Sequence, residues 1–315
     1  MRLGIDLGGT KIEGVALDET GEICCRKRLP TPAGSYEETL EAIVELVCQI
    51  ERQTGRSGTL GIGTPGAVSR MSGQIKNSNS TCLNGQFLRE DLTRRLGREV
   101  RIANDADCFA LSEASDGAGT GHAVVFGVIL GTGAGGGIVV NGQLVNGPNA
   151  IAGEWGHNPL YFSARDQNSA DWFSADRPER AQLLPDGNRR CNCGRLNCNE
   201  TYISGSGLQL SYQEQGGESL TAVEIAELAR NGDPLAERTL QLYQRQLARA
   251  LASVINILDP DAIVLGGGVS NIDSLYDEVP RLWQPHVFSD RVDTPLLKAK
   301  HGDSSGVRGA AWLWP

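Results

Sequence analysis

The sequence has no excess of basic residues, no long apolar run and no leader of the secretory type. Its 29 Lys and Arg residues are outnumbered by 38 Asp and Glu residues, which gives a formal net charge of −9. This balance does not suit a protein that lives on nucleic acid or anionic lipid. The densest apolar run, 123–130, is far too short to span a bilayer, and the start Met1–Asp6 does not join a charged leader to an apolar stretch. We therefore expect a cytoplasmic protein with no nucleic-acid or membrane partner.

The bulk composition is that of a folded globular protein, with 40% hydrophobic and 21% charged residues. A chain of 315 residues is too long for one ordinary core, so we expect two lobes. The glycine-rich stretch 117–121 is the expected joint. It divides the chain into an N-terminal lobe (1–117) and a C-terminal lobe (118–302), and a last helix of about 303–315 should pack back on the first lobe.

Both expected lobes open with the same pattern of buried strand, glycine turn and strand. In the first lobe, strands over 3–7 and 12–17 flank a Gly-Gly-Thr turn; in the second, strands over 123–130 and 138–140 flank a glycine-rich turn over 131–137. Strand, tight turn and strand form a hairpin, unlike the strand-turn-helix unit of a dinucleotide-binding fold. The repeated pattern indicates a weak internal duplication.

Several helices are predicted from their capping signals. Capping boxes at Ser35 and Thr221 predict the starts of two amphipathic helices, and the first of these should end near Gly55. Asp233-Pro234 supplies a cap and a first-turn proline ahead of a helix over 235–258.

Three glycine turns, each at the end of a buried strand, are typical of a phosphate cradle. Peptide N–H groups can donate to phosphate oxygens only where the backbone comes close, and glycine permits that approach. Asp6, just before the first turn, could hold Mg²⁺ through water, and Lys11 could add a cation. A single glycine turn of this kind is common in ordinary loops. The three together favour a nucleotide cleft between two lobes.

These residues also carry a resemblance to a known group. The segments Asp6–Lys11, Leu130–Gly133 and Leu265–Gly268 resemble the phosphate-1, phosphate-2 and adenosine motifs of actin-like ATPases. More narrowly, the whole chain resembles the ROK (repressor, open reading frame, kinase) family. The resemblance implies an α/β, two-lobed actin-like ATPase (ribonuclease H-like) fold with mixed sheets and an ATP cleft between the lobes. The implied ATP-contacting residues are Asp6, Gly8, Gly9, Thr10, Lys11, Thr132, Gly133, Gly266, Gly267 and Gly268.

Asp105 is the candidate catalytic base. Phosphorylating an alcohol requires a group that takes the hydroxyl proton, together with in-line positioning of donor and acceptor. Asp105 follows a strand over 100–103 and precedes a stretch of helix-forming composition, and it matches the catalytic aspartate of the ROK family. The alternative is that Asp105 only caps this helix. Asp107, two positions on, is a local rival that we interpret as part of the helix start.

A hexose pocket needs side chains that both donate and accept hydrogen bonds, and the resemblance supplies a set of candidates. The segment Glu154–His157 matches the E-x-G-H element of the family. The residues expected to contact the sugar are Gly66, Asn79, Asn104, Asp105, Glu154, His157 and Glu200.

Three of the eight cysteines, Cys191, Cys193 and Cys198, lie in one short polar loop. In a reducing compartment such a cluster is more often a metal site than a disulfide framework. With His157 it forms a Cys3His set, which suits a closed, structural Zn²⁺ site, and the resemblance carries zinc onto these four positions. Asn197 stands where the family usually has glycine, and the polar stretch 162–190 is interpreted as a solvated loop.

Within the family the chain most resembles bacterial fructokinases, some of which also accept mannose. The resemblance rests on Lys76–Thr81, Glu154–Leu160 and His301–Gly306. It implies transfer of the γ-phosphoryl group of MgATP to the 6-hydroxyl of D-fructose, with a small-molecule hexose as partner. N-acetylglucosamine kinase and glucokinase are the alternatives, because a small pocket change shifts acceptor preference by only ~1–3 kcal/mol.

Two other classes of protein, a sugar-responsive repressor and an actin-like chaperone or filament ATPase, share parts of this pattern. A repressor needs a helix-turn-helix module ahead of the sugar lobe, and Asp6 begins the phosphate turn too early for one. The glycine turns alone do not exclude a chaperone or filament ATPase, but the E-x-G-H element and the thiol loop favour a small-molecule acceptor. A homodimer is expected only because dimers are common in the family.

Overall fold

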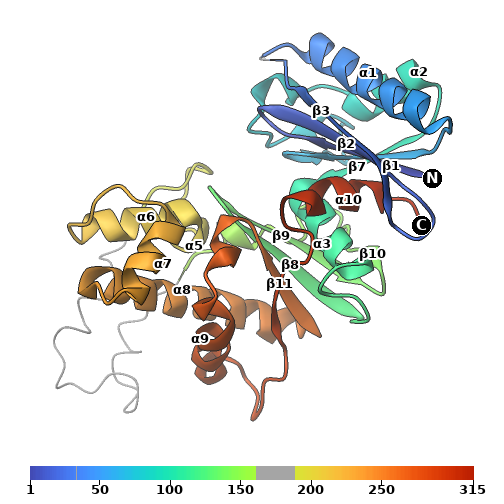
Figure 1. Cartoon of the computed structure of the whole chain (residues 1–315). Helices are drawn as coiled ribbons and strands as arrows, with labels where there is room; N and C mark the ends of the chain where they lie inside the picture. The colour runs from blue at the N-terminus through green and yellow to red at the C-terminus, as the bar shows by residue number, and fades with distance from the viewer. Residues whose placement is uncertain (33, 161–188) are drawn as a thin grey trace, which may run out of the picture.

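The computed structural model describes residues 1–32, 34–160 and 189–315, so most of the polar stretch 162–190 lies outside the described residues. It contains two five-stranded mixed sheets, ordered β3-β2-β1-β4-β7 and β10-β9-β8-β11-β12 (Figure 1). The first sheet is formed by β1 (Arg2–Leu7), β2 (Lys11–Leu17), β3 (Ile23–Pro30), β4 (Thr59–Thr64) and β7 (Val100–Asn104). The second is formed by β8 (Val124–Leu130), β9 (Ala134–Val140), β10 (Gln143–Leu144), β11 (Ala262–Gly266) and β12 (Leu296–Lys298).

The two sheets repeat one pairing scheme. In the first, β2 pairs antiparallel with β1 and β3, while β4 lies parallel to β1 and β7. In the second, β9 pairs antiparallel with β8 and β10, while β11 lies parallel to β8 and β12. An internal duplication, which the sequence predicts, would produce this repeated pairing. A separate ribbon of β5 (Ala67–Val68) and β6 (Ile75–Lys76) extends from the first lobe.

The helices begin where their capping residues predict. Ser35 Oγ accepts the N–H of Glu38 at the start of α1, which ends before Gly55 in the left-handed conformation (φ 66°). Thr221 forms a complete capping box, and Asp233 caps the helix that starts at Pro234. The described α-helices are α1 (Tyr36–Thr54), α2 (Leu88–Leu96), α3 (Asp105–Ser115), α5 (Glu200–Ile203), α6 (Gly205–Glu214), α7 (Ala222–Arg230), α8 (Pro234–Leu258), α9 (Ser274–Trp283) and α10 (Ser305–Ala311).

The second glycine turn is shorter than predicted, because β9 begins at Ala134 and includes three of the glycines that we expected in the turn. They belong to the strand because neighbouring elements approach it closely. A side chain at Gly136 would come within 2.8 Å of the Trp155 ring, and one at Gly137 within 2.7 Å of the Ala106 carbonyl oxygen. Glycine here therefore serves packing, which glycine content alone does not distinguish from a loop.

Each lobe has its own apolar core, and two helices lie between the sheets. Leu40, Ile43 and Val47 of α1 pack on the first sheet, whereas α5 to α9 enclose the core of the second. Helix α3 packs on β8 and β9, while α10 packs on β1, β4 and α3 (Figure 1). The C-terminal helix thus packs on the first sheet and on α3. No described helix is long and apolar enough to cross a membrane.

Candidate active site

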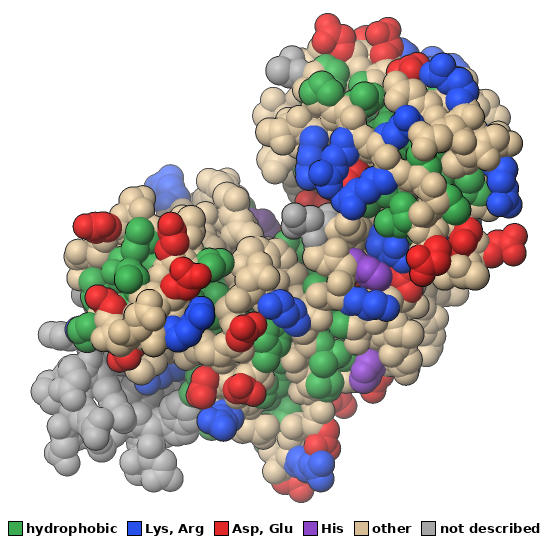
Figure 2. Space-filling view, in the orientation of Figure 1, with side chains coloured by type: hydrophobic (Ala, Val, Ile, Leu, Met, Phe, Trp, Pro, Cys, Tyr) green, Lys and Arg blue, Asp and Glu red, His purple; other side chains and the backbone are tan. Residues whose placement is uncertain are grey.

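The first glycine turn joins β1 to β2. The space-filling view shows a notch between the two lobes (Figure 2). The Gly8 N–H donates to the Lys11 carbonyl oxygen (3.0 Å), and Thr31 Oγ1 donates to the Gly8 carbonyl oxygen (2.7 Å). Burial, with the charges of Asp105 and Glu13, raises the pKa of Asp6 to about 6. A carboxylate in this setting gains from a nearby cation, which fits the predicted Mg²⁺ role.

The second and third turns lie side by side at the ends of β8 and β11. The Gly131 N–H donates to the Gly133 carbonyl oxygen (3.0 Å), and Gly267 (φ 79°) would place a side chain 2.5 Å from the Leu130 carbonyl oxygen. Gly268 has open space where a side chain would stand. Gly266 differs, because its Cβ would lie 2.3 Å from the Phe109 ring. The structure therefore packs Gly266 and Gly267 against neighbouring protein atoms and leaves Gly268 where a ligand can approach.

Asp105 is the first residue of α3, but it is not the residue that caps the helix. Asn104 occupies the cap position, and its Oδ1 accepts the Ala106 N–H (2.8 Å). Asp105 Oδ1 also accepts this N–H (2.8 Å), and part of the residue remains exposed to solvent. The protein atoms around it remove much of its hydration, and this desolvation raises the pKa of Asp105. Because Asn104 supplies the cap, Asp105 is available for chemistry.

Gly66 makes two close approaches near the predicted sugar residues. Asn104 Nδ2 donates to the Gly66 carbonyl oxygen (3.1 Å), and a side chain at Gly66 (φ 88°) would come within 2.5 Å of the Lys76 carbonyl oxygen. Asn79 is exposed in the loop after β6, and Ser80 next to it lies 3.9 Å from the Cβ position of Gly9. The Asn79 loop therefore lies beside the phosphate-1 turn.

Asn104 and Glu154 line a cavity of about 500 Å³ between the lobes. Asp107 lines it too, so our interpretation of Asp107 as a mere part of the helix start missed its position. Desolvation and the charge of Glu154 raise the pKa of Asp107 to about 7. The rest of the wall combines polar side chains with small or apolar ones. The polar residues are Ser69, Arg70, Arg89 and Asn146, and the apolar ones are Ala67, Val68, Ile102, Ala103, Val145, Ala150, Ile151 and Ala152.

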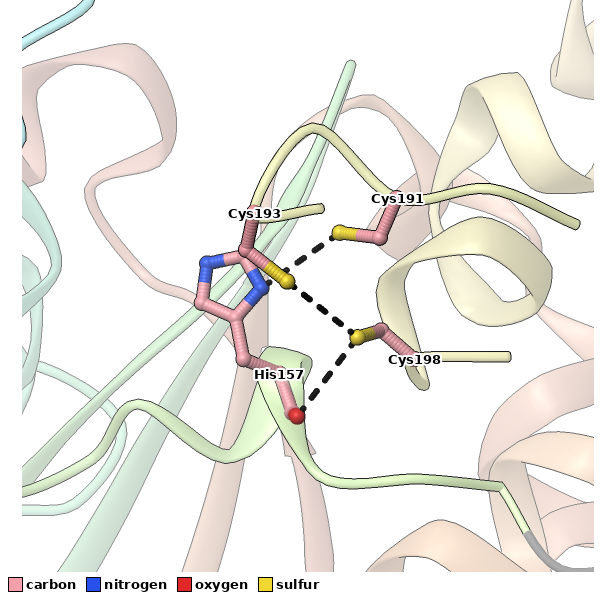
Figure 3. Close-up of side chains that lie close together, drawn as sticks. All are labelled: His157, Cys191, Cys193 and Cys198. Carbon is pink, nitrogen blue, oxygen red and sulfur yellow. Dashed lines mark hydrogen bonds between the residues drawn. The ribbon is translucent and has the colours of Figure 1, made fainter. Parts of the chain in front are cut away.

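The predicted zinc ligands converge (Figure 3). The imidazole of His157 and the thiols of Cys191, Cys193 and Cys198 offer donor atoms that all lie within 4.8 Å of one another. His157 Nδ1 is 3.6 Å from Cys191 Sγ, and Cys193 Sγ is 3.6 Å from Cys198 Sγ. Four ligands bound at ~2.3 Å to a tetrahedral Zn²⁺ ion stand ~3.8 Å apart. The donor set therefore fits zinc in both chemistry and spacing.

The zinc-site residues lie directly beside the predicted sugar residues. The Nε2 atom of His157 faces away from the thiols and lies 4.0 Å from Glu154 Oε2. Glu200 Oε1 is 3.7 Å from Cys191 Sγ, while its Oε2 accepts the Ala134 N–H (3.1 Å) at the end of the phosphate-2 turn. A side chain at Gly133 would come within 2.5 Å of this Oε2 atom. Glu200 therefore connects the thiol loop to the phosphate-2 turn, a link that spacing along the chain could not reveal.

Residues 2–315 match the ROK family. This chain belongs to that family. The ROK protein is 41% identical over 314 residues to an N-acetyl-D-glucosamine kinase of Haemophilus influenzae (strain 86-028NP), covering 100% of this chain and 99% of the relative. It is 40% identical over 313 residues to an N-acetyl-D-glucosamine kinase of Vibrio cholerae (serotype O1, strain El Tor Inaba N16961), covering 99% of each.

Solved structures agree on the fold. A ROK hexokinase of Thermus thermophilus superimposes with a TM-score of 0.81 at 30% identity, covering 99% of this chain and 96% of the other. A ROK glucokinase of Streptomyces griseus in complex with glucose and AMPPNP gives a TM-score of 0.74 at 28% identity, covering 99% and 98%. The predicted two-lobed actin-like ATPase fold and the predicted ROK membership are confirmed. The predicted fructokinase type is not supported by the relatives from H. influenzae and V. cholerae. Both are named N-acetyl-D-glucosamine kinases, which is one of our alternatives.

Proposed function

We propose that this ROK protein is an ATP-dependent kinase that transfers the γ-phosphoryl group of MgATP to the 6-hydroxyl of N-acetyl-D-glucosamine. The observation that carries the acceptor is the 40–41% identity, over nearly the whole chain, to relatives named for that activity. The fold neighbour holding both glucose and AMPPNP supports a site for a sugar and a nucleotide in the cleft.

The cavity beside Asn104 supports the same acceptor. N-acetyl-D-glucosamine differs from glucose by an acetamido group, whose methyl needs a small apolar space and whose N–H needs an acceptor. Ala67, Val68 and Ala152 offer the apolar wall, and Asp107 offers a carboxyl group on the same cavity. D-Fructose has no group that would fill this space.

The side chains fit the steps of phosphoryl transfer. Asp105 takes the proton of the 6-hydroxyl as its oxygen bonds to the γ-phosphorus, while the bond from that phosphorus to the bridging oxygen breaks and ADP leaves. The three glycine turns hold the phosphate chain and nucleotide through peptide N–H groups. Asp6 would hold Mg²⁺ through water, which offsets charge on the phosphates. Glu154, His157 and Glu200 hold the sugar ring, with Gly66, Asn79 and Asn104.

A panel of sugars tests the acceptor. With ADP release measured for N-acetyl-D-glucosamine, D-glucose, D-mannose and D-fructose, we expect kcat/KM for N-acetyl-D-glucosamine to exceed that of each other sugar by at least about tenfold, the scale of one well-matched pocket group. A higher value for D-fructose would restore the fructokinase interpretation. ADP release that no sugar alters would instead favour an actin-like ATPase of another class.

Asp6→Asn tests the magnesium role. The amide keeps the size of the side chain but removes its charge, so the Mg²⁺ concentration for half-maximal rate should rise by roughly tenfold or more, about 1.4 kcal/mol of lost attraction. The KM for the sugar should stay near the wild-type value, since Asp6 lies on the nucleotide side. Measurement is by titration of Mg²⁺ at fixed ATP. An unchanged Mg²⁺ requirement would remove Asp6 from the metal site.

A further inference from the structure

Glu113, near the end of α3, is a buried carboxylate that the phosphoryl-transfer chemistry does not use. Its side chain is fully buried (0% exposed). Oε2 accepts the N–H groups of Ala118 (2.9 Å) and Lys300 (3.0 Å). Oε1 accepts the N–H of His301 (3.2 Å) and the hydroxyl of Ser305 (2.8 Å). Each carboxylate oxygen therefore accepts two bonds, all from neutral donors.

Three of these donors lie where the chain passes from the second sheet to the first. Lys300 and His301 follow β12 of the second sheet, and Ser305 begins α10, which packs on the first sheet. The other passage is the junction of β7 with α3, at Asn104 and Asp105. Helix α3, of 11 residues and thus roughly 16 Å long, joins the two passages. Glu113 holds the second passage to one end of the helix whose other end carries Asp105.

Close backbone packing around Glu113 brings α3 and α10 together. A side chain at Gly117 would come within 2.3 Å of Glu113 Oε2, so glycine leaves room for the carboxylate. A side chain at Gly309 of α10 would come within 1.6 Å of the Cys108 carbonyl oxygen, so α3 and α10 meet with their backbones nearly in contact. Asp116 adds bonds to His301 Nε2 (2.9 Å) and Trp312 Nε1 (3.2 Å).

We propose that Glu113 is a positioning residue: it fixes the pivot between α3 and α10 about which the lobes close, and thereby sets where Asp105 meets the sugar hydroxyl. The two chain passages are the natural hinges of a two-lobed protein, because movement of one lobe against the other must be absorbed there. Glu113 accepts hydrogen bonds from Lys300 and His301, which follow β12, and from Ser305, which begins α10. These bonds would restrict the movement of one lobe against the other to a rotation, and α3 would transmit that rotation to Asp105. The kinetic part of this proposal rests on the proposed kinase activity.

Glu113→Gln tests the proposal. The amide NH2 would face two donors in place of an acceptor, so at least two of the four bonds are lost while the volume is kept. We expect kcat to fall by roughly tenfold or more, because small misplacement of a reacting group is costly, while sugar affinity changes by less than about threefold. Exchange of the Lys300 and His301 amide hydrogens should accelerate. The decrease in radius of gyration on adding N-acetyl-D-glucosamine with AMPPNP, measured by X-ray scattering, should shrink.

Val279→Ala is the matched control, because Val279 is buried in α9, away from α3 and α10. It should lower the melting temperature with kcat unchanged below the transition, which separates lost positioning from lost stability. If Glu113→Gln does not fold, Ser305→Ala tests the proposal instead, because it removes only one of the four donors. We then expect faster exchange of the His301 amide hydrogen and a fall in kcat smaller than that expected for Glu113→Gln. Wild-type kcat and wild-type closure in whichever variant folds would overturn the proposal. A wild-type protein that phosphorylates no sugar would count against the proposed function instead, and the exchange and scattering arms would still test the pivot.

Discussion

Asp105→Asn is expected to lower kcat by at least about a hundredfold, roughly 2.7 kcal/mol in activation free energy, the lower end of general-base contributions. The amide cannot take the proton that the sugar 6-hydroxyl must lose as it attacks. Its oxygen can still accept the Ala106 N–H, and Asn104 remains the cap of α3, so the helix should be unaffected. A coupled assay of ADP release measures kcat, and an unchanged melting temperature checks the fold.

Ground-state binding should survive this substitution. Glu154, His157 and Glu200 are untouched, so the dissociation constant for N-acetyl-D-glucosamine should change much less than kcat does. An interaction made mainly in the transition state behaves in this way, because its loss lowers kcat without a matching change in affinity. Equal loss of affinity and rate would mean that Asp105 mainly holds the sugar.

Asp107→Asn is the matched control, because Asp107 lies two residues along the same helix and lines the cavity beside Asn104. If Asp105 is the base, this control should retain kcat within roughly tenfold, since proton abstraction alone contributes at least a hundredfold. Asp107 faces Glu154 across the cavity, and its substitution should therefore act mainly on the KM for N-acetyl-D-glucosamine. Loss of kcat in Asp107→Asn with activity retained in Asp105→Asn would exchange the two roles.

Local signals predicted much of the fold because their causes are local. The capping residues Thr221 and Asp233 bond to the first turns of their own helices, so their effect is readable from neighbouring positions. The Gly8–Lys11 turn closes on itself through one hydrogen bond. The extent of β9 was mispredicted because Trp155 and Ala106, distant in sequence, require the glycines to be in a strand.

The fructokinase prediction came from three motifs, of which one, His301–Gly306, lies outside the cavity beside Asn104. His301 lies at the passage into α10, bonded to Glu113 and Asp116, where it can influence hinge geometry but not the sugar ring. His157 faces the thiol cluster with one nitrogen and Glu154 with the other, features shared by any acceptor. The cavity wall that we propose for the acetamido group joins β5, β7 and the loop after β10, and no short motif spans such distant segments.

Removal of zinc is expected to weaken sugar binding and stability together. Cys198 is buried (1% exposed) and forms an isolated β-bridge with Pro159, while Glu200 stands two residues later at the start of α5. Cys198→Ser removes one of the four ligands, so the loop would be held by its remaining hydrogen bonds, among them Asn199 N–H to the Asn158 carbonyl oxygen (2.7 Å). Glu200 should then lose its fixed place between Cys191 and the Ala134 N–H. Loss of a supporting contact around such a site costs about 10–100-fold in affinity or activity, and we expect a similar rise in the dissociation constant for N-acetyl-D-glucosamine.

The matched control is Cys48→Ser, which replaces an exposed thiol on α1 in the other lobe. Elemental analysis of protein purified under reducing conditions without chelators should give about one zinc per chain for the wild type and for this control, as one Cys3His site requires, and close to none for Cys198→Ser. The melting temperature and sugar affinity should fall only in the zinc-free protein. Because the four side chains would fill all positions around a tetrahedral ion, re-adding zinc to chelated wild type should restore affinity and stability to the same extent. Recovery of stability alone would separate the thiol loop from the sugar pocket, and wild-type protein without zinc would remove the metal from the site altogether.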